Sequence, residues 1–223
     1  MGNKMVPRTI NILVFFSACI AIAADFWDKE PLFKIFKPLT TILVTGLLFF
    51  GQNQKLTKFK TMVITALFFC LVGDILLLEE NWFVFGLGAF LIAHLLFAYG
   101  FVVLEGFYSN WKSLLAFLGL GISILFWLKP DLGSLELPVT IYIFVIIFMA
   151  WQGTGLFLKE KKNAYALIAI AVMLFMFSDT MIAVNKFKAP FKWSGLVILS
   201  TYWLSIALIA NGTFLRLKEE GTT

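Results

Sequence analysis

Residues 82–104 read WFVFGLGAFLIAHLLFAYGFVVL, an apolar run that contains one histidine and no Asp, Glu, Lys or Arg. About 20 predominantly apolar residues in a helix are enough to cross the hydrocarbon core of a bilayer. This run is therefore predicted to be a transmembrane helix, and the rest of the chain repeats its pattern. The fold class that follows is all-α, a polytopic transmembrane helix bundle of about eight spans.

Short loops that carry the Lys, Asn, Gly and Pro residues separate the apolar runs. The predicted spans are residues 8–24, 36–50, 61–78, 82–104, 113–128, 136–158, 164–184 and 192–214. The second and fifth runs are the shortest of the set. No stretch has the composition of a soluble domain or a disordered linker, so residues 1–223 are expected to form a single transmembrane domain.

The composition requires lipid as the solvent. Of the 223 residues, 61% are hydrophobic and only 14% are charged, and the mean hydropathy is +0.92. A soluble domain has about half of its residues apolar and about a quarter charged, and a chain of this length cannot hide such an excess in one core. The net charge of +5 is scattered over short loops, which is typical of topology signals and excludes a nucleic-acid face.

The first span has an alternative interpretation as a signal peptide. Lys4 and Arg8 precede the apolar stretch, and residues 21–23 resemble a small-residue cleavage site, which would leave seven spans. Because the segment runs directly into further spans, a retained span is preferred. Lys and Arg are more numerous on the side of the N-terminus, so we expect an integral protein of the bacterial inner (cytoplasmic) membrane with cytoplasmic termini.

Two carboxylates lie inside apolar runs, where they are costly. Asp74 is near the end of the third predicted span and Asp179 is near the end of the seventh. Each such residue at a helix centre raises the free energy of membrane insertion by about 2.5–3.5 kcal/mol. We therefore expect each Asp to have a hydrogen-bonding partner or a functional role. Because the two spans run in the same direction, both carboxylates are expected at similar depth, in the outer half of the bilayer.

Each Asp helix is followed by a helix with a candidate proton donor or acceptor. His94 follows Asp74 in the fourth span, and Tyr202 with Ser205 follows Asp179 in the eighth. His94 is expected to approach the level of Asp74 because its helix returns antiparallel after a tight turn. The two matches suggest a four-plus-four duplication of the chain.

Simpler interpretations stand beside these. An Asp near a helix end can snorkel to the interface, and a lone His in a membrane helix is often an interhelical contact. Tyr99, Tyr142 and Tyr202 are more often packing residues than catalysts. Lys37 and Pro38 are expected to form an interface anchor with a helix-start proline, or alternatively to place a cation near the carboxylates.

Paired carboxyl groups in a low-dielectric site do not both ionise easily, so one keeps its proton while the other is charged. The pair supplies an acid and a base, or an acid and a cation stabiliser, as in glycosidases. Metal catalysis is not expected, because there is one His and because Cys19 and Cys70 lie in apolar segments without ligand spacing. The same carboxylates suit a proton-coupled small-molecule or lipid transporter, and a non-catalytic lipid-binding or assembly protein is a third alternative.

A family resemblance favours acid–base catalysis over the transporter and the non-catalytic protein. Residues 73–78 (GDILLL), 83–90 (FVFGLGAF) and 93–94 (AH) are similar to the YhhN-like lysoplasmalogenase family of integral membrane proteins. Weaker similarities occur in family order across nearly the whole chain. They are Lys37–Thr40, Ser178–Asp179 with Asn185–Phe187, and Thr201–Tyr202 with Gly212.

The resemblance implies a hydrolase that acts on a lysophospholipid substrate, and from the residues no cofactor or metal is expected. It would cleave the vinyl ether bond of a lysoplasmalogen, an alkenylglycerophosphocholine or alkenylglycerophosphoethanolamine, to a fatty aldehyde and a glycerophospho-alcohol. At the matching positions the resemblance implies Asp74 and Asp179 as the catalytic acid and base. The expected supporting or substrate-binding residues are His94, Tyr202, Lys37, Ser178 and Lys186.

Overall fold

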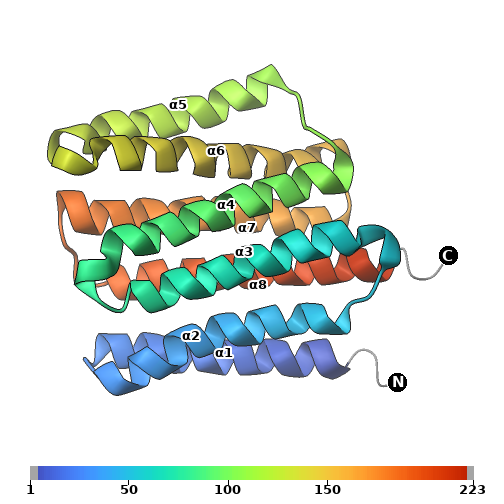
Figure 1. The fold of residues 1–223 in the computed structure, drawn as a ribbon, viewed down its shortest axis with the longest axis horizontal. Coiled ribbons are helices and arrows are strands. Elements are labelled where there is room, and N and C mark those ends of the chain that lie inside the picture. The colour runs from blue at the N-terminus through green and yellow to red at the C-terminus, as the bar shows by residue number, and fades with distance from the viewer. Residues whose placement is uncertain (1–4, 220–223) are drawn as a thin grey trace.

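The computed structural model of the protein describes residues 5–219 and contains eight long helices (Figure 1). They are α1 (Met5–Phe26), α2 (Glu30–Gly46), α3 (Thr57–Leu76), α4 (Phe83–Glu105), α5 (Trp111–Leu128), α6 (Glu136–Lys159), α7 (Asn163–Ala183) and α8 (Ser194–Glu219). All eight are long and apolar enough to cross a membrane, so the predicted fold class is confirmed. Residues 1–4 and 220–223, with Lys4 and the ends of both predicted cytoplasmic tails, lie outside the described residues.

The second span is longer than its apolar run indicated. α2 begins at Glu30 rather than at residue 36, and a 3₁₀ turn over Leu47–Phe50 extends it. Pro31 lies in the first turn, where its missing N–H is no loss, and Glu30 suits the positive end of the helix dipole. The prediction of Pro38 as a helix-start proline is wrong, since Pro38 lies inside α2.

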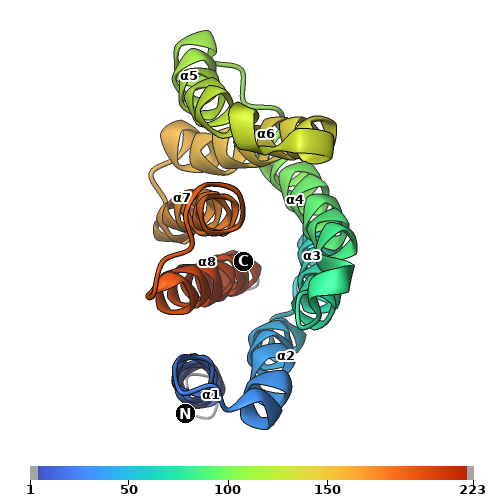
Figure 2. The same cartoon turned by 90° about the vertical axis from the view of Figure 1, so that its left-hand side faces the viewer.

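The helices form two curved layers (Figure 2). One layer holds α1, α8 and α7, and the other holds α2, α3 and α4. α6 packs against both α4 and α7 and closes one side, and α5 covers α6 from outside. α1 packs against α2 and α8, with Ser17 Oγ 2.7 Å from Thr40 Oγ1 of α2. The first span is therefore an integral part of the bundle.

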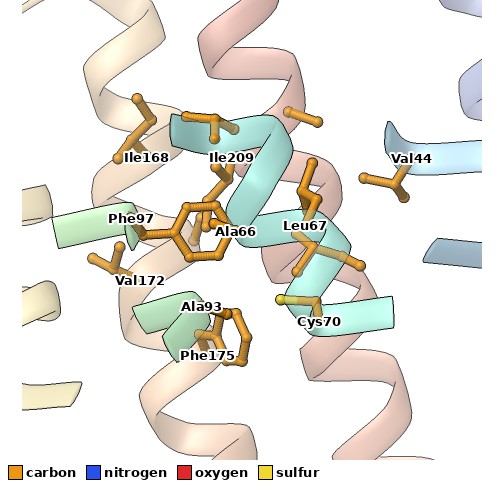
Figure 3. Close-up of a cluster of buried hydrophobic side chains, with 14 of the residues drawn as sticks. Val44, Ala66, Leu67, Cys70, Ala93, Phe97, Ile168, Val172, Phe175 and Ile209 are labelled. Carbon is orange, nitrogen blue, oxygen red and sulfur yellow. The ribbon is translucent and has the colours of Figure 1, made fainter. Parts of the chain in front are cut away.

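A buried apolar cluster fills the space between the layers (Figure 3). Leu67 and Cys70 of α3 and Phe97 of α4 meet Val172 and Phe175 of α7 there, and all five are fully buried. Small residues let neighbouring helices approach closely, as in other membrane bundles. A Cβ atom at Gly212 of α8, for example, would lie 2.7 Å from the Ala164 carbonyl oxygen of α7.

The helix directions place both carboxylates at one end of the bundle. α3 and α7 run the same way, and each ends beside the turn that leads to the next helix (Figure 1). We call this end, with the α1–α2, α3–α4, α5–α6 and α7–α8 connections, the carboxylate end. α1 begins and α8 ends at the opposite end. Asp74 and Asp179 therefore lie toward the same end of the bundle, and their similar depth in a bilayer stays a prediction.

The close α7–α8 contact predicts that Gly212→Leu destabilises the protein. The side chain must displace backbone, and overpacking of this kind costs about 1–3 kcal/mol. The matched control is Gly119→Leu on α5, where a Cβ atom meets nothing within 4 Å. Thermal unfolding in detergent should show a lower midpoint for Gly212→Leu alone, and equal midpoints for the two variants would contradict the predicted packing.

Candidate active site

Asp74 is held by hydroxyl groups from two other helices. Its carboxylate is 1% exposed, and its Oδ2 atom accepts hydrogen bonds from Thr41 Oγ1 of α2 at 2.5 Å and from the Tyr202 hydroxyl of α8 at 2.9 Å. Burial of a carboxylate is tolerated only when such donors replace water. The contacts therefore fix α2, α3 and α8 relative to one another at the carboxylate end.

Lys37 supplies a cation to the same group. It lies on α2 four residues before Thr41, is 6% exposed, and interacts electrostatically with Asp74 and Asp25. Its Nζ atom is 5.4 Å from the centroid of the Phe33 ring. Lys37 is buried, and α2 begins seven residues before it at Glu30. Its two interpretations, an interface anchor and a cation near the carboxylates, stay predictions.

Asp179 has a second and separate set of partners. The Tyr142 hydroxyl of α6 donates to its Oδ2 atom at 2.6 Å, and His94 Nε2 of α4 lies 3.5 Å from the same atom. His94 is fully buried between the rings of Tyr142 and Phe175, at 5.4 and 4.6 Å between centroids. Within residues 5–219 neither imidazole nitrogen has a hydrogen-bond partner.

The buried imidazole of His94 lies beside Asp179, but within residues 5–219 it forms no hydrogen bond. Buried polar groups are nearly always paired with protein or with an ordered water. The His94 Nε2 atom, 3.5 Å from Asp179 Oδ2, is the imidazole nitrogen that faces the site.

Aromatic rings separate the two carboxylate groups. Phe175 contacts His94 on one side and Tyr202 on the other, with 5.5 Å between the Phe175 and Tyr202 ring centroids. Phe90 adds a second ring, 5.5 Å from Tyr202 and 6.4 Å from Phe175. In the described part of the chain no hydrogen bond or ion pair joins Asp74 to Asp179. Phe175 contacts both His94, which lies beside Asp179, and Tyr202, which donates to Asp74, so the two carboxylate groups adjoin.

The partners are exchanged between the halves of the chain. Each carboxylate receives a hydroxyl from the helix before its own: Thr41 for Asp74 and Tyr142 for Asp179. Asp74 of α3 also accepts a hydrogen bond from Tyr202 of α8, the helix that follows α7. In the same way, Asp179 of α7 lies near His94 of α4, the helix that follows α3. A four-plus-four duplication with crossed contacts would leave this pattern. The sequence predicted the level of His94 but not its partner, which the structure gives as Asp179.

Asp179 also lines a cavity of about 50 Å³, which is room for water. Asp74 is not among the lining residues. The polar side chains in the wall are Asp179, Tyr142 and Thr180. The apolar wall consists of Phe83, Leu87, Ile124, Leu128, Val139, Ile143, Ile146, Met176, Ile182, Ala183 and Phe187. The cavity therefore places one carboxyl group at the wall of an apolar chamber.

The remaining predicted residues lie beside the site rather than in it. Ser178 is buried, and its hydroxyl donates to the Ile198 carbonyl oxygen of α8 at 3.0 Å, which ties α7 to α8 next to Asp179. Lys186 lies in a π-helical turn, Val184–Lys188, that extends α7. Its Nζ atom pairs with Glu80 at 2.8 Å on the surface of the carboxylate end.

Thr41 and Tyr142 were not among the predicted site residues. Thr41 lies one helical turn after Lys37, and that spacing could have identified it. Tyr142 lies near the start of the sixth span, and Asp179 lies near the end of the antiparallel seventh span. Their depths therefore match. A search for hydroxyl groups at the depth of each carboxylate would have found both residues.

Comparison with known proteins gives a consistent family assignment. A model of the YhhN family matches residues 32–213. The chain is 28% identical to "Lysoplasmalogenase TMEM86A" of Homo sapiens over 94% of this chain and 88% of the relative. It is 32% identical to "Lysoplasmalogenase" of Mycobacterium bovis over 68% and 60% of the two chains, and 25% identical to "Uncharacterized membrane protein YhhN" of Escherichia coli O157:H7 over 92% and 98%. No solved structure matches the chain.

The Asp74 contacts predict that Thr41→Val lowers stability by about 1–3 kcal/mol, because the buried carboxylate loses a donor. Thr45→Val is the matched control, since Thr45 Oγ1 bonds only the Thr41 carbonyl oxygen of its own helix, at 2.8 Å. Thermal unfolding in detergent compares the two variants. A midpoint for Thr41→Val as high as that of Thr45→Val would show that the Thr41 bond contributes nothing.

Proposed function

The chain belongs to the YhhN family, and from this membership and the site geometry we propose that it is an intramembrane lysoplasmalogen hydrolase. The reaction is cleavage of the vinyl ether bond of an alkenylglycerophosphocholine or alkenylglycerophosphoethanolamine to a fatty aldehyde and a glycerophospho-alcohol. Relatives named lysoplasmalogenase support the reaction class. The observation that carries the proposal is the Asp179 carboxyl group in the wall of an apolar cavity inside the bundle.

A vinyl ether is cleaved by protonation at carbon rather than at oxygen. A proton delivered to the β-carbon of the double bond leaves an oxocarbenium ion at the α-carbon. Water adds to the α-carbon and gives a hemiacetal, which collapses to the aldehyde and the free glycerol hydroxyl. The reaction needs a proton donor, a stabilised cation and a positioned water, and carboxylates supply this chemistry in glycosidases.

Asp179 is the proposed proton donor. Its Oδ2 atom accepts a hydrogen bond from the Tyr142 hydroxyl. Within residues 5–219 no donor contacts Oδ1, so this oxygen is the one proposed to face the substrate. After the proton has passed to the β-carbon, the Asp179 carboxylate lies next to the oxocarbenium ion. It then accepts a proton from the attacking water, so the same group serves first as acid and then as base.

His94 is the proposed site of the nucleophilic water. Its Nε2 atom lies 3.5 Å from Asp179 Oδ2, so a water bound to this nitrogen would be within reach of the carboxylate that must accept its proton. The rings of Phe175 and Tyr142 fix the imidazole plane. Asp179 and His94 together would hold the water beside the α-carbon.

Asp74 is the proposed charged carboxylate of the pair. Hydroxyl donors from Thr41 and Tyr202 and the nearby Lys37 are arranged around it, and such groups stabilise a negative charge. It acts on the oxocarbenium ion across the Phe90 and Phe175 rings. In a low-dielectric interior, charges interact over longer distances than in water.

The substrate headgroup is proposed to lie at the carboxylate end, outside the cavity. Lys186 is exposed there in a surface pair with Glu80, and such pairs are worth little, so Lys186 can exchange Glu80 for a lipid phosphate. Ser178 supports the site by tying α7 to α8. With cytoplasmic termini in a bacterial inner membrane, the carboxylate end would face the outer side.

Replacing Asp179 with Asn is expected to lower kcat by roughly a thousandfold, because the amide cannot deliver a proton. Asp74→Asn is expected to lower kcat by roughly ten- to a hundredfold with little change in KM, since it removes charge outside the substrate cavity. Release of aldehyde by purified protein in detergent measures both variants.

Asp28→Asn is the matched control, in an exposed turn with φ of 52°, where Asn is well tolerated. It should keep full activity. Full turnover by folded Asp179→Asn would remove Asp179 from the mechanism, and a change confined to KM in Asp74→Asn would remove the charge role of Asp74.

Hydrolysis in deuterium oxide is expected to place one deuterium on the carbon next to the aldehyde group, because the mechanism protonates the vinyl β-carbon. Mass spectrometry of the aldehyde, trapped at once as a stable derivative, measures the label. Aldehyde without deuterium at that carbon would contradict protonation at carbon.

A further inference from the structure

A second cavity of about 300 Å³ lies between α4 and α6, at the carboxylate end. Its wall is almost wholly apolar, and the Tyr142 hydroxyl is its one polar side-chain group. It is lined by Val84, Leu87, Gly88, Leu91, Leu135, Leu137, Pro138, Val139, Ile141 and Tyr142. We call this cavity the α4–α6 groove.

The α4–α6 groove adjoins the cavity that holds Asp179. Leu87, Val139 and Tyr142 line both. These three side chains therefore form the partition between the groove and the Asp179 chamber. A molecule that lies in the groove and passes this partition reaches the Asp179 carboxyl group directly.

The groove faces the surroundings of the bundle rather than its core. Val84, Leu137 and Ile141 are exposed, and α4 and α6 adjoin without a third helix in front of this part of them (Figure 2). In a protein that spans a membrane, this face meets lipid chains. A Cβ atom at Gly88 would meet nothing within 4 Å, so the glycine leaves open space in the wall.

We propose that the α4–α6 groove admits the alkenyl chain of the substrate sideways from the bilayer and holds it while the vinyl ether lies at Asp179. This inference rests on the proposed function and adds the site that binds the chain. A lipid that enters this way never leaves the hydrocarbon, so its chain need not be exposed to water. The headgroup stays at the carboxylate end, beside Lys186.

The dimensions of the groove favour a hydrocarbon chain over a helix from a partner protein. Along α4 the lining residues run from Val84 to Leu91, which is about 10 Å at the rise of an α-helix. A transmembrane helix is itself about 10–12 Å wide and packs along much of its length. A short, narrow apolar groove that leads to a carboxyl group fits a single chain.

The partition residues then set the position of the reacting bond. With the carbon chain in the groove and the headgroup at the surface, the vinyl ether bond lies between the two. The carbon chain passes Leu87 and Val139 and reaches the hydrogen-bonded Tyr142–Asp179 pair. Tyr142 would have two tasks, since its hydroxyl orients Asp179 and its ring forms part of the chain site. Chain preference should therefore depend on the groove, while the chemistry depends on Asp179.

The test fills the groove with a side chain. Gly88→Trp places an indole in the α4–α6 groove, and Gly119→Trp is the matched control at a helical glycine of α5 with equally open space. The measurement is kcat/KM for lysolipids with hexadecenyl and butenyl chains. We expect Gly88→Trp to lower the ratio of long-chain to short-chain kcat/KM by about tenfold, the effect of losing about two buried methylene groups.

A ratio for Gly88→Trp equal to that of Gly119→Trp would overturn the groove as the chain site. A dimer in detergent that Gly88→Trp disrupts, with the ratio unchanged, would assign the groove to a second copy and would also overturn the proposal.

Binding separates this inference from the proposed function. Native mass spectrometry with the non-hydrolysable hexadecyl ether analogue measures occupancy whether or not the protein hydrolyses vinyl ethers. Gly88→Trp should retain less bound analogue than Gly119→Trp. Absence of aldehyde from the unaltered protein would refute the proposed function alone, whereas equal occupancy of the two variants would refute the groove alone.

Discussion

The structure depends on how two carboxylates are accommodated inside hydrocarbon. An unpaired carboxylate there is so costly that its neighbours must supply donors. Thr41 and Tyr202 do so for Asp74, and Tyr142 does so for Asp179. The Thr41 and Tyr142 bonds join consecutive helices, and the Tyr202 bond joins α8 to α3 across the two layers. The requirement to pair the carboxylates therefore also holds the layers together at one end of the bundle.

The sequence predicted what depends on position along a helix. Eight spans, the shared direction of α3 and α7, and the placement of both carboxylates toward the same end of the bundle follow from apolar runs and from counting turns. It could not predict which way each helix face points or which helices are neighbours. The sequence therefore predicts the level of His94 near that of Asp74, but only the structure shows that Asp179 is its neighbour. Lys37 was expected at the interface because the apolar run begins after the true start of α2.

The two carboxylates differ in surroundings, and the difference suggests a division of tasks. Asp74 is enclosed by donors, a lysine and aromatic rings, which suits a fixed charge. Within the described part of the chain, Asp179 has one donor, an adjacent imidazole without hydrogen bonds and an apolar chamber, which suits proton transfer to a lipid. A membrane site of this kind brings the proton to the lipid chain and keeps the chain in hydrocarbon.

The central claim, protonation of a vinyl ether by an intramembrane carboxyl group, is tested most directly by substrate choice. Purified protein is incubated with three lysolipids of equal chain length, one alkenyl, one alkyl ether and one acyl. Our account predicts aldehyde from the alkenyl lipid and no product from the alkyl ether, which has no double bond to protonate. No aldehyde from the alkenyl lipid, or fatty acid released from the acyl lipid at a comparable rate, would contradict it.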